Sequence, residues 1–287
     1  MLNLRLSANC HLPDDCTAYF CITMKIILGC LPLLVIIISC NNQDQAKADV
    51  ETAFAREHIL KDSISKFPGL LLLKEELIQL YRDSAAYDKA ITIANEALQN
   101  DSSNARLWDI KGTLHFENED TLNAITSFET ALELNPSPRY LILLGSLYAQ
   151  TKNERALPIA DALIKTKLPE TEKEALFIKG LYYNFIGNKK NAIDFFDKCL
   201  NLDNRHMFAY REKGIALYDL GKYEDAIAVL DKAVTLQNSF DEGYYWLGQC
   251  LEKLNKPDEA IEEYKTALLY SPDYVEAKEA LERLKAS

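Results

Sequence analysis

Small and apolar residues recur along the chain with a period close to 34 positions from Leu71 onward. The glycines that mark this period are Gly112, Gly145, Gly180, Gly214 and Gly248, and their spacings are 33, 35, 34 and 34 residues. A constant period of this length indicates a repeat architecture, in which each copy is one supersecondary unit that stacks on its neighbours.

A second series of small residues keeps the same phase. It consists of Ala90, Ala124, Ala192, Ala226 and Ala260, spaced by 34 residues except for one gap of 68 that covers a degenerate copy. The two series predict paired helices, because small residues permit close helix approach while Phe128, Phe196 and Tyr264 fill the space between.

The complete pattern resembles the tetratricopeptide repeat (TPR), a helix–turn–helix unit. The second copy matches it at Trp108, Gly112, His115, Ala124, Phe128, Ala131 and Pro136, and the sixth at Tyr244, Leu247, Gly248, Leu251, Ala260, Tyr264, Ala267 and Pro272. The resemblance implies an all-α fold, a right-handed α-solenoid of about six copies. We place these copies at 71–104, 105–137, 138–172, 173–206, 207–240 and 241–274.

The flanks of the repeats also read as helical. Residues 50–67 predict an N-terminal helix, and residues 275–287 predict a capping helix with a charged outer face, which solenoid ends require. The third copy is degenerate: Pro158 falls near the start of its second helix, and Lys165–Glu174 is polar and contains Pro169. We therefore predict a distorted repeat and a bend there.

An apolar run of thirteen residues, Ile26–Ile38, precedes the repeats and contains Gly29 and Pro32. A membrane-spanning helix needs about 20 apolar residues, and proline is disfavoured in a helix interior. The run matches the apolar centre of a secretory signal, with Lys25 in front of it.

The four residues Ile37–Cys40 resemble the lipobox of bacterial lipoproteins. This resemblance implies cleavage before Cys40 and a diacylglycerol on its thiol, with two or three acyl chains giving firm membrane attachment. An ordinary secretory signal, or a buried apolar segment in which Cys40 is incidental, is the alternative. We assign 1–23 to a gene-model extension, with translation starting at Met24, 24–39 to the signal peptide and 40–49 to a flexible tether without apolar content. Asn41 follows the cysteine, and by resemblance this favours the outer membrane over the inner membrane of the cell envelope.

The net charge and the motifs of the sequence limit the possible classes of function. The net charge is −11, which argues against a nucleic-acid partner because phosphate binding relies on Lys and Arg. Cys199 and Cys250 sit at apolar repeat positions and read as small buried hydrophobes, with a disulfide between them as the alternative. The sequence contains no G-x-S-x-G, H-E-x-x-H or Walker motif, so we expect no enzyme activity, cofactor, metal or small-molecule substrate.

The family resemblance implies that positions 2, 5, 9 and 12 of each copy face a binding groove. In copies four to six the selected groove residues are Phe177, Leu181, Asn184, Phe208, Arg211, Ile215, Tyr218, Tyr245 and Gln249. Either they bind a helix or an extended segment of another protein, or they pack against neighbouring helices as core. No copy has the Lys at position 5 and Asn at position 9 with which chaperone-binding TPRs grip a carboxylate.

These observations favour a membrane-anchored TPR lipoprotein that acts as a protein-interaction scaffold in cell-envelope assembly or maintenance. Its layout is similar to TPR lipoproteins of outer-membrane protein assembly, of type IV pilus biogenesis and of peptidoglycan-hydrolase scaffolding. A periplasmic chaperone for unfolded or secreted clients, and a structural homo-oligomer, are the alternatives.

Overall fold

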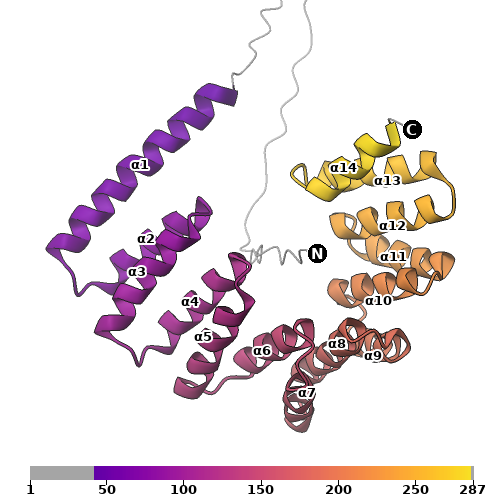
Figure 1. Ribbon diagram of the computed structural model, residues 1–287, viewed down its shortest axis with the longest axis horizontal. Coiled ribbons are helices and arrows are strands. Elements are labelled where there is room, and N and C mark those ends of the chain that lie inside the picture. Colours follow the sequence, from indigo (N-terminus) through magenta and orange to yellow (C-terminus); the bar gives the residue numbers. More distant parts are fainter. Residues whose placement is uncertain (1–41, 286–287) are drawn as a thin grey trace, which may run out of the picture. The chain divides into compact units, whose positions relative to one another are not determined.

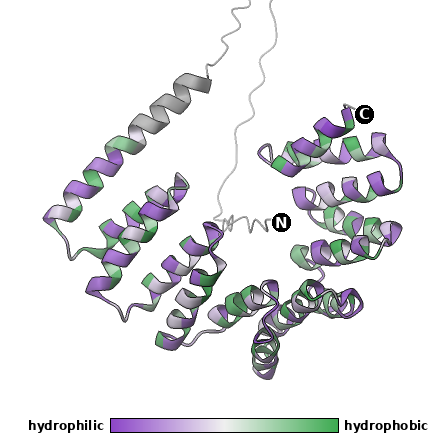
Figure 2. Ribbon diagram, viewed as in Figure 1, coloured by the Kyte–Doolittle hydropathy of each residue, from purple (hydrophilic) through white to green (hydrophobic). Residues whose placement is uncertain are grey.

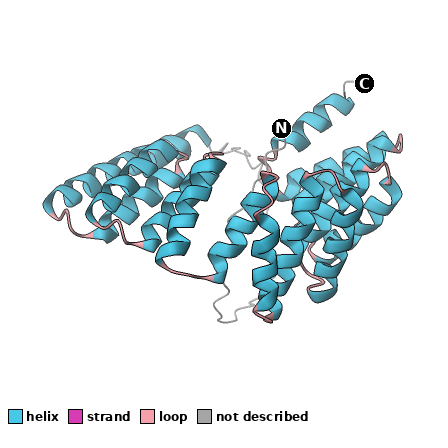
Figure 3. Cartoon of the chain, turned by 60° about the horizontal axis from the view of Figure 1, so that its bottom comes forward, coloured by secondary structure: helices cyan, strands magenta, loops and turns pink. Residues whose placement is uncertain are grey.

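The chain folds into consecutive α-helices. A computed structural model describes residues 42–285, and every regular element in that range is helical (Figures 1 and 3). The chain divides into two units, Met1–Ala48 and Asp49–Ser287, and the packing described below belongs to the second. The predicted all-α class is confirmed.

From α2 onward, each helix packs against the next one along the chain. The helices are α1 (Asn42–Lys66), α2 (Leu71–Asp83), α3 (Tyr87–Asn100), α4 (Ala105–Glu117), α5 (Thr121–Leu134), α6 (Pro138–Gln150), α7 (Ala156–Lys165), α8 (Pro169–Phe185), α9 (Lys189–Leu202), α10 (Met207–Asp219), α11 (Tyr223–Leu236), α12 (Asp241–Lys253), α13 (Pro257–Tyr270) and α14 (Val275–Lys285). Sequential packing of this kind is that of an α-solenoid, with α2, α4, α6, α8, α10 and α12 as the first helices of the six copies.

Glycine in the first helix allows an aromatic ring of the second helix to lie against the backbone. A Cβ atom added to Gly248 would lie 2.6 Å from the ring of Tyr264, and one added to Gly112 would lie 2.8 Å from the ring of Phe128. Both distances are shorter than van der Waals contact. The expected pairing of small and large residues is therefore confirmed.

All six copies turn between their helices through a left-handed residue. This residue is the fifteenth of each predicted copy: Ala85 (φ 53°), Glu119 (60°), Lys152 (59°), Gly187 (86°), Gly221 (71°) and Asn255 (60°). Only two of the six are glycine, the residue that adopts this conformation without steric cost. The turn residue thus has the same position in each of the six predicted copies.

Polar loop residues begin several of the helices. The Asn104 side chain accepts hydrogen bonds from the amides of Arg106 and Leu107 at the start of α4, and Asp120 and Asn188 cap α5 and α9 in the same way. Such caps satisfy amides that have no partner inside the helix.

The third copy differs from the others in its short second helix and in the position of its end. Helix α7 has only 10 residues, and α8 begins at Pro169 instead of at the predicted boundary of 173. Proline is well tolerated in the first turn of a helix, so Pro169 starts α8 and does not interrupt the chain. Helix α6 packs against α8 as well as α7. The bend itself stays a prediction.

The N-terminal helix is longer than predicted. It begins at Asn42, so most of the segment predicted as a flexible tether, 40–49, is helical. The sequence QDQAKAD that follows Asn42 contains neither Gly nor Pro, and Gln, Lys and Ala are good helix formers.

The described helices carry hydrophobic and hydrophilic residues together, as expected when one face is buried (Figure 2). None of the helices within 42–285 is both long and apolar enough to span a membrane. Segments 1–23 and 24–39, together with Cys40, lie outside the described residues, so the signal peptide and the lipid attachment stay predictions.

Candidate protein-interaction surface

The structure places the nine predicted groove residues on three first helices. Phe177, Leu181 and Asn184 lie on α8; Phe208, Arg211, Ile215 and Tyr218 lie on α10; Tyr245 and Gln249 lie on α12. Helix α10 packs against both α8 and α12. The nine residues therefore come from directly adjacent helices.

Four of the nine are too deeply buried to line an open groove. Their exposed fractions are 9% for Phe177, 3% for Leu181, 6% for Asn184 and 4% for Arg211. The repeat position of a residue predicts on which side of the helix it lies. In these four cases, however, other parts of the solenoid cover the side chain. In this structure these four side chains lie in the core, and their part in partner binding stays a prediction.

Phe177 and Arg211 show what covers this side of the helices. The ring of Phe177 packs 4.7 Å from His206 and 5.9 Å from Phe196, measured between ring centroids. The Arg211 guanidinium forms ion pairs with Glu212 at 3.0 Å and with Glu242 at 2.6 Å. Phe177 is thus covered by residues of its own copy, whereas Arg211 joins the fifth copy to Glu242 of the sixth.

The other five residues keep part of their surface open. Phe208, Ile215, Tyr218, Tyr245 and Gln249 are half-buried, and we call this set the α10–α12 surface. Ile215, Tyr218 and Tyr245 pack against one buried cluster that includes Trp246. The Tyr218 and Tyr245 rings each lie 5.5 Å from the Trp246 ring, so the surface rests on a rigid aromatic base.

Hydrogen bonds and burial fix the aromatic groups next to this surface. Gln249 donates a hydrogen bond to the Tyr264 hydroxyl at 2.8 Å, and that hydroxyl donates to Glu252 at 2.5 Å. Burial raises the pKa of Tyr245, and burial together with the hydrogen bond to Glu252 raises the pKa of Tyr264. Both phenols therefore stay protonated at neutral pH.

The corresponding positions of the first copies carry ion pairs between neighbouring repeats. Glu75 accepts a hydrogen bond from Arg106 at 2.9 Å, and Asp109 accepts one from Arg139 at 2.6 Å. In each pair, position 5 of one copy meets position 2 of the next, and Arg211 meets Glu242 in the same way with the charges exchanged. We did not predict these ion pairs, although opposite charges 30 or 31 residues apart in the sequence indicate contacts between neighbouring copies.

The remaining reactive side chains have structural roles. Cys199 and Cys250 are free and buried, and burial raises the pKa of each thiol to about 12, so they behave as small hydrophobes. Nδ1 of His206 accepts a hydrogen bond from the Ala209 amide at the start of α10. Among the residues that the structure describes, no cluster of His, Cys, Asp and Glu has the arrangement of a metal site.

Comparison with known families supports the repeat assignment. Two family models described as tetratricopeptide repeat match residues 105–138 and 211–274. A model described as anaphase-promoting complex, cyclosome, subunit 3 matches residues 149–233. Human "Superkiller complex protein 3" is 27% identical over 159 residues, which is 53% of this chain and 10% of that protein. The chain thus spans about a tenth of the length of this curated relative.

Solved structures with the same fold cover most of the chain. A tetratricopeptide repeat protein from Parabacteroides merdae is 21% identical, with a TM-score of 0.69 over 86% of this chain and 97% of its own. The type IV pilus biogenesis factor PilW is 18% identical, with a TM-score of 0.56 over 74% of this chain and 99% of its own. At these identities the likeness shows the fold alone. The family models show tetratricopeptide repeats in this chain over residues 105–138 and 211–274.

Proposed function

We propose that the chain is a lipid-anchored scaffold that binds another protein through the α10–α12 surface. TPR proteins mediate protein–protein interaction. The observation that carries the proposal is the partial exposure of Ile215, Tyr218 and Tyr245 around the buried Trp246. Aromatic side chains held rigidly and left partly open are typical interface anchors, because they bury much apolar area at little conformational cost.

The chemistry of this surface favours an amphipathic helix or an extended segment as the bound element. Apolar anchors at Phe208, Ile215 and Tyr245 offer contacts along two adjacent helices, and the half-buried Gln249 adds a polar group. Segments of this kind bind grooves between helices through a few spaced apolar side chains.

Attachment to the membrane is the second part of the proposal. The Ile37–Cys40 sequence and the short apolar run before it support acylation of Cys40 and a place in the cell envelope, at the outer membrane. Labelling with a radioactive fatty acid tests this part. We expect label on the wild type and on Cys30→Ala, and none on Cys40→Ala; label retained by Cys40→Ala would refute the lipid site.

Affinity purification tests the binding surface. Full-length tagged protein is purified from crosslinked, detergent-solubilised membranes and its partners are identified by mass spectrometry. We expect one stoichiometric partner, lost in Phe208→Ala/Tyr218→Ala but kept in Leu269→Ala. Leu269 is a matched control, since it is apolar and 74% exposed on the second helix α13.

Other results would contradict the scaffold function. Many substoichiometric clients would indicate a chaperone, and recovery of the chain alone would indicate a homo-oligomer. If the partner remained bound to the double variant, it would bind elsewhere on the solenoid. Circular dichroism of the variants checks that their helicity is unchanged.

A further inference from the structure

The ring of Tyr274 extends the α10–α12 surface beyond the predicted groove residues. Tyr274 directly precedes α14 and is half-buried, like Tyr245 on α12. The centroids of the two rings lie 5.0 Å apart, and both side chains pack against the hydrophobic cluster that includes the buried Tyr264. Tyr245 and Tyr274 thus form a partly open pair of rings, which we call the tyrosine patch.

Two other rings of the surface already have a cation of this chain beside them. The Arg211 guanidinium lies 5.1 Å from the centre of the Phe208 ring, and the Lys253 ammonium lies 5.9 Å from the centre of the Tyr218 ring. Within residues 42–285, no lysine or arginine lies over either ring of the tyrosine patch. Because the face of an aromatic ring attracts a cation, the patch offers a place for one that this chain does not supply.

Three carboxylates lie close to the tyrosine patch. Asp241 and Glu242 are in the first turn of α12, and Glu276 is in the first turn of α14. Burial raises the pKa of Tyr274, and the carboxylates of Glu242, Glu276 and Asp241 raise it further, because they would repel a phenolate. Glu276 also adds to the effect of burial on the pKa of Tyr245. Carboxylates from two helices therefore act on the same pair of rings.

The negative charge of these carboxylates is not balanced within the surface. Glu242 shares the single guanidinium of Arg211 with Glu212, at 2.6 and 3.0 Å. In the described part of the chain, no lysine, arginine or histidine forms an ion pair with Asp241 or Glu276. Exposed carboxylates are well hydrated, so they cost the free protein little, but they attract a basic partner and repel an acidic one.

Two cations of α14 do not offset this charge, because each has its own carboxylate. Lys278 pairs with Asp273 at 3.7 Å, and Arg283 pairs with Glu252 at 2.7 Å. The region around the tyrosine patch therefore keeps an excess of negative charge.

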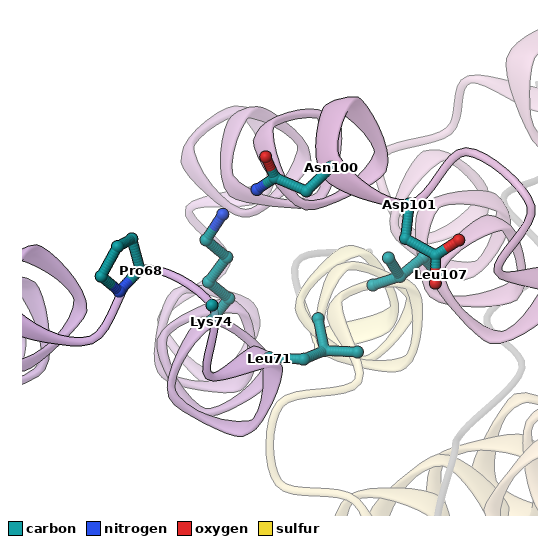
Figure 4. A pocket seen from close by; sticks show the side chains of 7 residues that line it. Pro68, Leu71, Lys74, Asn100, Asp101 and Leu107 are labelled. Carbon is teal, nitrogen blue, oxygen red and sulfur yellow. The ribbon is translucent and has the colours of Figure 1, made fainter.

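The pocket of the first copy has no such excess. It has a volume of about 520 Å³ and is lined by Pro68, Gly69, Leu71, Lys74, Asn100, Asp101 and Leu107 (Figure 4). One ammonium group and one carboxylate, those of Lys74 and Asp101, belong to the same lining and offset each other. That pocket selects neither charge, whereas the tyrosine patch favours a cation.

We propose that the partner segment bound on the α10–α12 surface is basic, and that one of its lysine or arginine side chains lies on the tyrosine patch. This role of the patch rests on the proposed function, since it concerns the segment that the surface binds. Apolar side chains of the segment contact Ile215 and Tyr218, and its cation lies on the two rings near Asp241 and Glu276. The charge adds specificity, because an acidic segment of equal hydrophobicity is repelled.

Peptide titration of the full-length protein in detergent tests the proposal. The probes are three fluorescent amphipathic peptides with the same leucine positions, whose polar positions carry lysine, glutamine or glutamate. Fluorescence anisotropy gives their dissociation constants, with detergent alone as the blank. At physiological salt we expect the lysine peptide to bind about tenfold more tightly than the glutamine peptide, and the glutamate peptide to bind most weakly.

Charge-matched variants separate the tyrosine patch from the overall charge of −11. Asp241→Asn/Glu276→Gln should weaken binding of the lysine peptide about fivefold, because it removes two carboxylates beside the rings. Glu224→Gln/Asp225→Asn removes two exposed carboxylates from the first turn of α11 and should weaken it by less than about twofold. Tyr274→Leu should weaken binding of the lysine peptide but not of the glutamine peptide, because leucine keeps the apolar contact without the aromatic face.

The same titrations distinguish a failure of this proposal from a failure of the proposed function. If the lysine and glutamine peptides bound equally well and both were lost in Phe208→Ala/Tyr218→Ala, the surface would bind segments without selecting basic ones. Equal weakening by the two charge variants would also overturn the basic partner, since overall charge would then explain the preference. If the lysine peptide bound Phe208→Ala/Tyr218→Ala as well as the wild type, the α10–α12 surface itself would not be the binding site.

Discussion

At the scale of residues, the ion pairs between position 5 of one copy and position 2 of the next differ in burial. In the first copies the arginines of the pairs are largely in solvent, with Arg106 71% and Arg139 58% exposed. Between α10 and α12, the Arg211 side chain is 5% exposed and lies against Glu212, which is 3% exposed. Exposed pairs contribute little to stability, whereas removal of one partner from a buried pair leaves a desolvated charge.

Replacement of Arg211 should therefore destabilise the protein strongly. We expect Arg211→Met to lower the free energy of unfolding by about 3–5 kcal/mol, because Glu212 would keep a buried negative charge without its partner. Arg106→Met at the equivalent junction should cost less than about 1 kcal/mol. Urea denaturation followed by circular dichroism measures both, and equal losses in the two variants would contradict this account.

Sequence reasoning identified these positions but not their burial. The repeat phase assigned Phe177, Leu181 and Arg211 to the groove side of their helices, and the structure buries all three. The accessibility of a helix residue depends on side chains from other elements: His206, at the end of the fourth copy, packs against Phe177, and Glu242 of the next copy pairs with Arg211.

At the scale of elements, the turn between paired helices is the feature that the repeat conserves most strictly. Its fifteenth residue is left-handed in every copy, although Ala85, Glu119 and Lys152 have side chains that disfavour this conformation. Packing of the two helices therefore outweighs local preference in these turns.

At this position, replacing alanine by glycine and replacing glycine by alanine should change the free energy of unfolding in opposite directions. Ala85→Gly should raise the free energy of unfolding by about 1 kcal/mol, and Gly221→Ala should lower it by about the same amount. A Cβ atom at Gly221 would meet nothing within 4 Å, so the effect of that change is on the backbone alone. Thermal denaturation of the two variants provides the measurement, and changes of the same sign would disprove the strain in this turn.

Most helices could be predicted from the sequence because each copy repeats the same glycine, alanine and aromatic positions. One boundary differs from the prediction: α8 starts at Pro169, four residues before the predicted start of the fourth copy at 173, because a first-turn proline loses no intrahelical hydrogen bond. The prediction failed at Asn42, since absence of apolar residues was taken as evidence against a helix that good helix formers support.

At the scale of the whole molecule, each copy contacts mainly its neighbours, so distinct surfaces can lie on distinct copies. The fifth and sixth copies hold the α10–α12 surface, whose half-buried apolar side chains suit recognition of protein segments. The proposed function requires direct contact between a partner and the α10–α12 surface.

Photocrosslinking in the cells that make the protein tests that contact most directly. A photoreactive phenylalanine analogue replaces Phe208, Tyr218 or Tyr245, and, as a control, Leu269 on α13. We expect each of the three surface positions to give one discrete crosslinked species that contains the same partner, and Leu269 to give none. A smear of products, a crosslink to a second copy of this chain, or the same species from Leu269 would contradict the proposed function.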